Sequence, residues 1–384
     1  MSASPVLALV AGEASGDYLA SLLLAGLRGR WPGLTSHGIG GPRMQAAGFE
    51  AWWSSDRLAV RGYVEVLRHY REIVGIRRAL KNRLLAERPG LFIGVDAPDF
   101  NLALEADLKK AGIRTLHFVC PSIWAWRAGR VEQLRRSVDH VLCIFPFEPE
   151  LLAQSGIAAT YVGHPLASAI PMEPDRAGAR RLLGLDPHDT VLAVLPGSRA
   201  SEIRYLAPRF LAAAKLLLRS RPQLRIVVPA LPALRAAISQ AAQAAGVGDV
   251  VTLVDGQSHA VLAACDAVLV ASGTATLEAA LFKRPMVIGY AMHPLSWQIM
   301  RRQRLQPWVG LPNILCREFV VPELLQQAAS PAALAAAIEP WLDAAAVDPA
   351  RLQALQQRFA AMHSELRRDT SKLAADAIEK VLAG

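Results

Sequence analysis

The sequence predicts an α/β protein with two Rossmann-like domains that face each other across a cleft, followed by C-terminal helices. Three observations lead to this fold class. Short apolar runs alternate with longer amphipathic segments, which is typical of βα units around a parallel sheet. Five such runs fall in each half of the chain, and a Pro-rich polar stretch at 165–175 separates the two halves.

The apolar runs give the expected strands in order. The first domain, residues 1–168, contains five of them: Val6–Val10, Leu91–Val95, Thr115–Val119, Val141–Ile144 and Thr160–Val162. The second domain, residues 175–340, contains the other five: Val191–Leu195, Arg225–Val228, Val250–Val254, Ala267–Val270 and Met286–Tyr290. After about residue 330 the chain is rich in Ala, Leu and Gln and carries regularly placed prolines. We therefore expect residues 341–384 to form helices without a further strand.

Composition narrows the class of protein. The 384 residues suffice for two domains, each with its own core. Hydrophobic residues make up 52% of the chain, yet no apolar run approaches the ~20 residues that span a bilayer, which excludes an integral membrane protein. The apolar start Val6–Ala11 is too short for a signal sequence, so a cytoplasmic location is expected. The four cysteines lack CxxC spacing, which argues against zinc and against disulfides.

The net charge of +9 implies an anionic partner. Nucleic acid, a phosphorylated ligand and an anionic membrane surface all fit this charge. The arginines interleave with aliphatic residues and not with aromatic stacking platforms, and no nucleic-acid-binding motif is present. Nucleic acid is therefore the least favoured of the three partners.

Two turns in the second half are suited to phosphate. Gly197, Ser198 and Arg199 follow the run Val191–Leu195, and Ser272, Gly273 and Thr274 follow Ala267–Val270; both turns open helix-like segments. Such a turn presents free backbone N–H groups at the positive end of a helix dipole. Two of them on one sheet indicate a nucleotide diphosphate, with the Arg199 guanidinium adding charge. Glu278 lies one helical turn further on, where its carboxylate could accept from ribose hydroxyls.

Two polar turns in the first half are candidates for the acceptor side. The turn Gly12–Asp17 follows the first strand and is read either as a ligand loop or as a structural turn in which Ser15 or Asp17 caps a helix. Asp96 and Asp99 follow the run Leu91–Val95. Because Asp99 stands at a helix start after a proline, we expect it to cap that helix. This leaves Asp96 as the candidate general base.

The segment 57–84 combines aliphatic and basic residues. Its pattern suits a lipid-facing surface, whose apolar side chains enter the bilayer while the arginines meet headgroups. The residues singled out are Val64, Leu67, Ile73, Arg68, Arg71 and Arg77. An ordinary domain helix with a solvated basic face explains the same pattern. Residues 297–308 repeat this apolar and basic chemistry, with Trp297, Met300 and Trp308 beside Arg301, Arg302 and Arg304, and two such segments favour lipid contact.

The set of motifs, taken in order along the chain, resembles the lipid-A-disaccharide synthase family. The motifs are Ala11–Asp17, Gly41–Met44, Asp96–Asn101, Trp124–Trp126, Leu195–Arg199, Ser272–Glu278 and Leu311–Asn313. The resemblance runs from about residue 6 to residue 320. It implies an inverting glycosyltransferase of the two-Rossmann-domain (GT-B) type that uses neither a metal nor a cofactor.

The resemblance also implies substrates and roles. The enzyme would transfer 2,3-diacylglucosamine from UDP-2,3-diacylglucosamine to the 6-hydroxyl of 2,3-diacylglucosamine 1-phosphate (lipid X), at the cytoplasmic face of the inner membrane of Gram-negative bacteria. Members of the family can form homodimers by exchanging C-terminal segments, so the helices of 341–384 either pack back on their own first domain or are exchanged.

By matching motif, Asp96 would be the general base. Glu13 and Ser15 would belong to the catalytic loop on the acceptor side, and Asn313 to the donor site. One departure is visible: Ala291 stands where many relatives carry a basic residue. A UDP-N-acetylglucosamine 2-epimerase shares the double-Rossmann plan and is the main alternative among enzymes.

Overall fold

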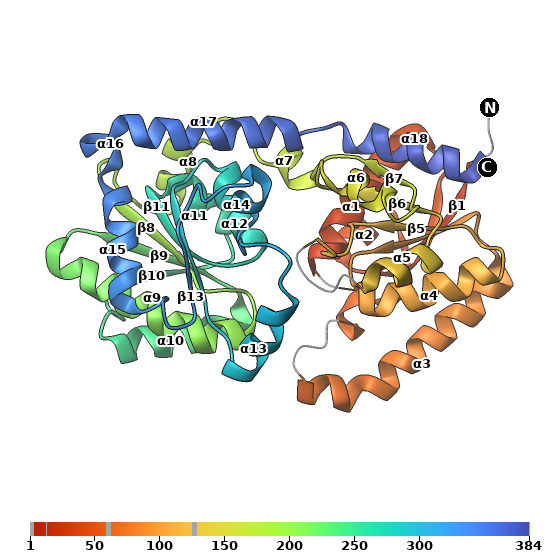
Figure 1. Ribbon diagram of the computed structural model, residues 1–384, viewed down its shortest axis with the longest axis horizontal. Coiled ribbons are helices and arrows are strands. Elements are labelled where there is room, and N and C mark those ends of the chain that lie inside the picture. Colours follow the sequence, from red (N-terminus) through yellow and green to blue (C-terminus); the bar gives the residue numbers. More distant parts are fainter. Residues whose placement is uncertain (1–3, 13, 59–62, 125–128, 384) are drawn as a thin grey trace. The chain divides into compact units, whose positions relative to one another are not determined.

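The structure is a computed structural model that describes residues 4–12, 14–58, 63–124 and 129–383, with the side chains of 14 and 63–70 excepted. Its contacts divide the chain into two units. The first unit comprises Met1–Ser168 together with Glu365–Gly384, and the second unit comprises Ala169–Ser364. Each unit has an α/β architecture (Figure 1).

The first unit is built on a parallel sheet in the order β3-β2-β1-β4-β5-β6-β7. The strands are β1 Val6–Ala11, β2 Thr35–Gly40, β3 Glu50–Ser54, β4 Leu91–Val95, β5 Thr115–Phe118, β6 His140–Cys143 and β7 Ala159–Tyr161. The chain order reverses between β1 and β4. This neighbouring pair is therefore the topological switch point, where ligands of such sheets bind.

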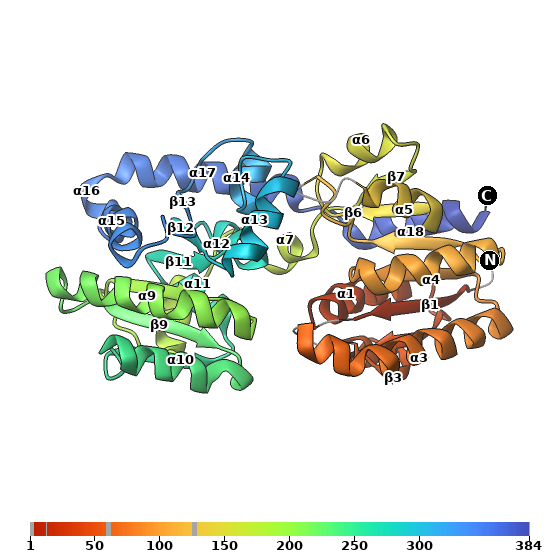
Figure 2. The ribbon, with the colours of Figure 1, turned by 60° about the horizontal axis from the view of Figure 1, so that its bottom comes forward.

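Helices cover both faces of this sheet (Figure 2). One face carries α1 Ala14–Arg30, α2 Pro42–Ala46 and α18 Thr370–Ala383, and the other carries α3 Tyr63–Glu87, α4 Pro98–Lys110 and α5 Arg130–Ser137. Shorter elements complete the unit: η1 Ser55–Arg57, α6 Glu148–Ala153 and α7 Pro165–Ala169. The C-terminal helix α18 packs on α1, so the end of the chain returns to the first unit.

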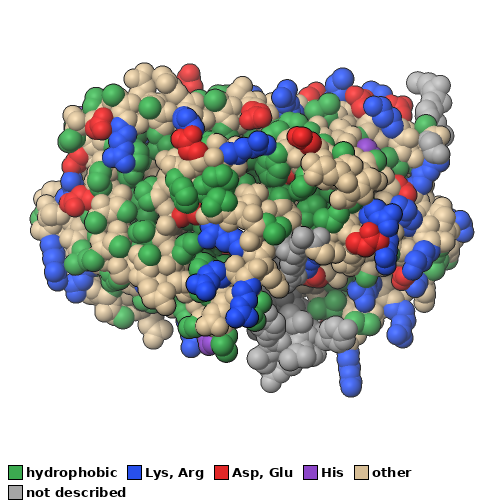
Figure 3. All heavy atoms as spheres, in the orientation of Figure 1, with side chains coloured by type: hydrophobic (Ala, Val, Ile, Leu, Met, Phe, Trp, Pro, Cys, Tyr) green, Lys and Arg blue, Asp and Glu red, His purple; other side chains and the backbone are tan. Residues whose placement is uncertain are grey.

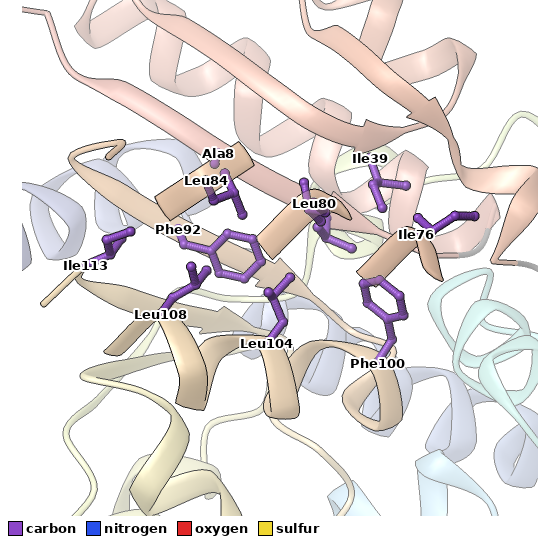
Figure 4. Packing of buried hydrophobic residues seen from close by; sticks show 11 residues of the cluster. Ala8, Ile39, Ile76, Leu80, Leu84, Phe92, Phe100, Leu104, Leu108 and Ile113 are labelled. Carbon is purple, nitrogen blue, oxygen red and sulfur yellow. The ribbon is translucent and has the colours of Figure 1, made fainter. Parts of the chain in front are cut away.

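The core under α3 and α4 shows how the sequence pattern produces this packing. Ile76, Leu80 and Leu84 recur every four residues along α3 and are buried against Phe92 of the sheet and Leu104 of α4 (Figure 4). This spacing puts all three on one face of the helix. The C-terminal half of α3 is thus a packed helix of the domain.

The second unit repeats the same topology with a parallel sheet in the order β10-β9-β8-β11-β12-β13. The strands are β8 Val191–Leu195, β9 Arg225–Ala230, β10 Val251–Asp255, β11 Ala267–Ala271, β12 Met286–Tyr290 and β13 Glu323–Leu325. The switch point lies between β8 and β11. Both strands consist wholly of buried residues, as expected for the centre of a parallel sheet.

Helices also cover both faces of the second sheet. One face carries α9 Ala200–Ser220, α10 Pro232–Ala245 and α15 Pro331–Leu342, and the other carries α8 Arg176–Leu182, α11 Ser258–Ala264 and α12 Thr274–Leu281. The remaining helices are α13 Pro294–Gln303, α14 Leu311–Cys316, α16 Ala344–Val347 and α17 Pro349–Leu366. Among the described residues, none of the helices is long and apolar enough to cross a bilayer.

The predicted fold class is confirmed, and all ten expected strands are present with ends that differ by at most two residues. Three strands were not expected: β2, β3 and β13. β2 contains two glycines among its six residues, and β13 is three residues long, so neither forms an apolar run. Trp52 and Trp53 lie on β3 and pack against the core cluster.

Candidate active site

Four polar turns lie at the two switch points. In the first unit, the turn after β1 carries Ser15 and the turn after β4 carries Asp96; Ala11 and Val95, the last residues of the two strands, are direct partners in the sheet. In the second unit, the turn after β8 carries Arg199 and the turn after β11 carries Ser272. The topology thus places each pair of motifs at the carboxyl edge where a ligand of this fold binds.

Asp96 stands on a strained backbone. Its φ is 50° and that of Ala97 is 43°, so two successive non-glycine residues adopt the left-handed conformation. Such residues cost about 1–3 kcal/mol each and gather at functional sites. Asn101, which is fully buried, donates a hydrogen bond from Nδ2 to the Asp96 carbonyl oxygen at 2.8 Å. This contact fixes the turn, while the Asp96 side chain remains half-buried at the sheet edge.

The turn after β1 packs closely against the Asp96 turn. A Cβ at Gly12 would lie 3.2 Å from the Cβ of Ala97, so a side chain here would press the two turns apart. Ser15 is exposed in the first turn of α1. Glu13 lies outside the described residues.

Asp17 performs a structural task that the sequence did not reveal. Its buried carboxylate accepts hydrogen bonds from the backbone amides of Gly41, Arg43 and Met44, at 2.9–3.1 Å. These amides form the N-terminus of α2, so Asp17 caps α2 and not its own helix. A Cβ at Gly41 would lie 2.6 Å from this carboxylate, which explains the glycine.

The expectation that Asp99 caps its helix is wrong. The N-cap position of α4 is Ala97, and no side chain caps this helix. Asp99 is exposed and forms an ion pair with Arg130. The proline at the first helical position has no N–H to satisfy, which lessens the need for a side-chain cap.

In the second unit, Glu202 occupies the turn after β8. Its Oε2 accepts hydrogen bonds from the backbone amides of Ser198 at 2.9 Å and Arg199 at 3.2 Å, and its Oε1 lies 3.4 Å from the Arg199 guanidinium. Gly197 has a φ of 125°, and a Cβ there would lie 2.4 Å from the carboxylate. The two amides expected to bind phosphate are therefore satisfied within the protein. The Arg199 side chain remains 61% exposed.

Glu202 was missed by the sequence reasoning, although a signal was present. It lies three residues after the N-cap of α9, the spacing of a capping box. The pattern was obscured because an arginine, and not serine or threonine, stands at the N-cap.

The turn after β11 is open. Gly273 is the N-cap of α12 with a φ of 147°; no side chain caps this helix, and Thr274 is exposed. The Ser272 hydroxyl donates to the carbonyl oxygen of Val309 at 2.9 Å, which ties the turn to the segment before α14. The start of α12 is thus the less obstructed of the two predicted phosphate turns.

Glu278 lies on α12, and burial raises the pKa of its carboxyl to about 7. His259, at the start of α11, places its Nε2 3.7 Å from the carboxylate. His259 was not singled out from the sequence. Its position just after strand β10 is the only signal that could have drawn attention to it.

The side chain of Asn313, a residue that the family resemblance assigns to the donor site, forms its hydrogen bonds within the protein. Its side chain is fully buried; Nδ2 donates to Val321 and Glu323, and Oδ1 accepts from Val320 and Val321, all at 2.9–3.0 Å. These four hydrogen bonds use the full capacity of an amide side chain and leave none for a direct donor contact. Glu323 in turn accepts from the amides of Val309 and Gly310, so Asn313 supports the segment that holds Ser272.

The structure places the residues expected to face lipid in different environments. Ile73 is partly buried and packs against the core cluster. Arg71 is exposed and Arg77 is half-buried. The side chains of Val64, Leu67 and Arg68 lie outside the described residues.

The fold defines the class of protein. The calicheamicin glycosyltransferase superposes with a TM-score of 0.61 at 17% identity, covering 99% of this chain and 98% of that one. The UDP-N-acetylglucosamine 2-epimerase of Neisseria meningitidis, solved with UDP-N-acetylglucosamine, gives a TM-score of 0.66 at 12% identity over 98% and 99%. Identities this low show the fold alone. The chain is an α/β protein of the GT-B type.

Sequence comparison defines the family. The profile of the lipid-A-disaccharide synthetase family matches residues 7–378. The lipid-A-disaccharide synthase of Verminephrobacter eiseniae is 66% identical over 384 residues, which is 100% of this chain and 99% of the relative. That of Albidiferax ferrireducens is 66% identical over 378 residues, covering 98% and 97%. The chain belongs to the lipid-A-disaccharide synthetase family and is an enzyme.

Proposed function

We propose that this enzyme condenses UDP-2,3-diacylglucosamine with 2,3-diacylglucosamine 1-phosphate to give a β-1,6-linked disaccharide 1-phosphate and UDP. The observation that carries this proposal is the 66% identity, over the entire chain, to a lipid-A-disaccharide synthase. The similarity to a 2-epimerase, at 12% identity, extends to the fold alone and does not favour epimerisation.

Incubation of the purified enzyme with both acylated substrates tests the proposal. We expect UDP release that depends on the acylated acceptor, and a disaccharide product identified by mass spectrometry. Epimerisation of UDP-N-acetylglucosamine, without any disaccharide, would contradict it.

For the chemical step we propose direct displacement with inversion. Asp96 takes the proton of the acceptor 6-hydroxyl while that oxygen attacks the anomeric carbon from the face opposite UDP. The bond from the anomeric carbon to the β-phosphate oxygen breaks, and its electron pair leaves with UDP. The strained turn and the half-buried side chain of Asp96 support this role, since they present a carboxylate at the sheet edge. Ser15 and Glu13 are assigned to the acceptor side by their motif.

The donor is assigned to the second unit. Negative charge grows on the departing β-phosphate, and groups of fixed positive character lower the energy of that transition state. The exposed Arg199 guanidinium and the uncapped start of α12 at Gly273 supply such groups. Because Glu202 holds the amides of Ser198 and Arg199, we assign the diphosphate to the Arg199 side chain and the Ser272–Thr274 turn.

Glu278 is the proposed ribose ligand. Its buried carboxyl lies one turn into α12, and the hydroxyls of a ribose would provide donors that stabilise its charged form. We assign Asn313 an indirect role in keeping the Val309 carbonyl in place for Ser272.

We further propose that the enzyme works at the cytoplasmic face of the inner membrane, where its acylated substrates reside, and that it forms a homodimer. Sedimentation of the purified enzyme tests the homodimer, with a single species of twice the chain mass as the expected result. A species of one chain mass at all concentrations would contradict it.

A further inference from the structure

Helix α13 differs from the other long helices of its unit because none of its residues is buried. Leu295 is 66% exposed and Ile299, one turn later, is 61% exposed. Leu305, just beyond the helix, is 54% exposed, and Phe319 is 62% exposed. Single exposed aliphatic residues are common on protein surfaces, but two at i and i+4 on one short helix form a continuous apolar face.

The segment around α13 carries basic residues but no acidic ones. From Ala291 to Arg317 the chain contains no Asp or Glu, whereas it contains Arg301, Arg302, Arg304 and Arg317. Arg301 and Arg302 line a hollow of ≈ 420 Å³ together with Trp297, Gln298 and Gln327. Among the described residues, no ion pair joins either arginine to a carboxylate. In Figure 3, the lower edge of this unit, where Figure 1 places α13, carries basic (blue) side chains next to hydrophobic (green) ones.

Packing within the second unit does not bury Leu295 and Ile299, and no ion pair among the described residues neutralises Arg301 and Arg302. An exposed apolar face with unpaired arginines and no acidic residue is complementary to a bilayer that contains anionic lipids. The apolar side chains would enter the boundary of the acyl chains, and the guanidinium groups would meet phosphate headgroups. A soluble protein partner would have to be both apolar and acidic over the same small area.

We infer that α13, with Leu295, Ile299, Arg301 and Arg302, is a docking surface for an anionic lipid bilayer. This inference rests on the proposed function in one respect: acylated substrates give the enzyme a reason to dock. It extends the lipid contact expected at residues 297–308 to helix α13 and names the side chains that make it, whereas Ile76, Leu80 and Leu84 of α3 are buried in the core.

Flotation with vesicles tests the docking surface. The probes are vesicles of phosphatidylcholine alone and vesicles with 30% phosphatidylglycerol, a composition of roughly one anionic lipid in three, which gives a clear negative surface potential. We expect the wild-type protein to prefer the anionic vesicles. Leu295→Ser with Ile299→Ser should lower binding at least about tenfold at low and high salt, since two exposed aliphatic side chains no longer enter the bilayer.

Arg301→Gln with Arg302→Gln should lower binding by roughly tenfold at low salt and little at high salt, because salt screens headgroup attraction. Two matched pairs serve as controls within the same unit. Leu182 and Val347, which are 68% and 78% exposed, are replaced by serine, and the exposed arginines Arg181 and Arg219 by glutamine. Neither control should change binding.

Three results would overturn the inference. The wild-type enzyme would not float with the vesicles, the serine variant of α13 would float like wild type, or the control variants would lose as much vesicle binding as the α13 variants. Loss of self-association in the α13 variants, with vesicle binding intact, would assign the surface to a second copy instead.

Turnover with detergent-dispersed substrates separates this inference from the proposed function. Variants that turn over normally in detergent yet fail to float support docking, whereas a wild-type enzyme that floats but makes no disaccharide contradicts the proposed function alone.

Discussion

The carboxylate of Glu202 accepts a hydrogen bond from the backbone amide of Ser198 at 2.9 Å. It also accepts from the amide of Arg199 and lies beside the guanidinium of that residue. An anionic group therefore already occupies the start of α9, the position at which the sequence predicts phosphate. Glu202 both fixes the turn and competes with a diphosphate for the charge of Arg199.

The first prediction concerns this competition. Glu202→Gln keeps the size and one acceptor oxygen but removes the negative charge beside Arg199. UDP affinity measured by calorimetry should rise roughly twofold to fivefold, the scale of a partly exposed ion pair. A tenfold fall in affinity in a folded variant would show that Glu202 shapes the turn for UDP and does not compete with it.

The second prediction separates donor from acceptor. Arg199→Ala should weaken UDP binding by about 10- to 100-fold, since a hydrogen bond to a charged group contributes about 1.5–3 kcal/mol. Ser15→Ala should leave UDP affinity unchanged and lower turnover. Unchanged UDP affinity in the Arg199 variant would remove this turn from the phosphate site.

The third prediction is a pH dependence. Burial raises the pKa of Glu278 from 4.5 to about 7, so the folded protein holds a proton that the unfolded chain releases between these values. The contribution of Glu278 to the free energy of unfolding therefore falls as pH rises through that window. Ribose hydroxyls favour the carboxylate, so UDP affinity should rise up to about tenfold between pH 6 and pH 8.

Glu278→Gln provides the control for this pH dependence, because UDP itself titrates identically with both proteins. We expect the variant to lose the rise in affinity. Parallel pH profiles for the wild-type enzyme and the variant would exclude Glu278 from the ribose contact.

The fourth prediction concerns the return of the chain to the first unit. A Cβ at Gly26 of α1 would lie 2.0 Å from the Oγ and 3.0 Å from the Cα of Ser371 on α18. Gly26→Ala should therefore force α18 off α1, lower the melting temperature and expose the C-terminal helix to protease. At Gly29, on the same helix, a Cβ meets nothing within 4 Å. Gly29→Ala should stabilise the protein slightly, by up to about 1 kcal/mol, through helix propensity. Equal melting temperatures for the two variants would contradict this packing.

The sequence patterns predicted the central strands because these are buried on both faces. Val191–Leu195 and Met286–Tyr290 are continuous apolar runs whose observed bounds equal the predicted ones. The strand Thr35–Gly40 was not predicted because its glycines give no apolar signal, although Thr35–Ile39 pair with Val6–Val10 of β1. The backbone hydrogen bonds that hold a strand in a sheet do not require apolar side chains, so the composition of this segment does not indicate the strand.

The sequence predicted where the candidate site lies, but not which groups hydrogen-bond with its side chains. The turns of Asp96 and Arg199 follow recognisable strands, so their place at the sheet edge followed from the order of the elements. The roles of Asn313 and Glu202 could not be predicted in this way. The role of each depends on which amides face it, and this is decided by the path of the backbone after the turn.

The central claim is that Asp96 removes the proton of the acceptor hydroxyl, and the most direct measurement compares Asp96→Asn with Asp99→Asn. Asparagine keeps the shape of the side chain but cannot take a proton at neutral pH. Turnover of the Asp96 variant with both acylated substrates should fall by roughly 10²–10⁴, the range typical of a lost general base, while its UDP affinity stays near wild type. The Asp99 variant loses an exposed ion pair with Arg130 and should keep most of its turnover. Small and equal losses in both variants would contradict the assignment of Asp96 as the base.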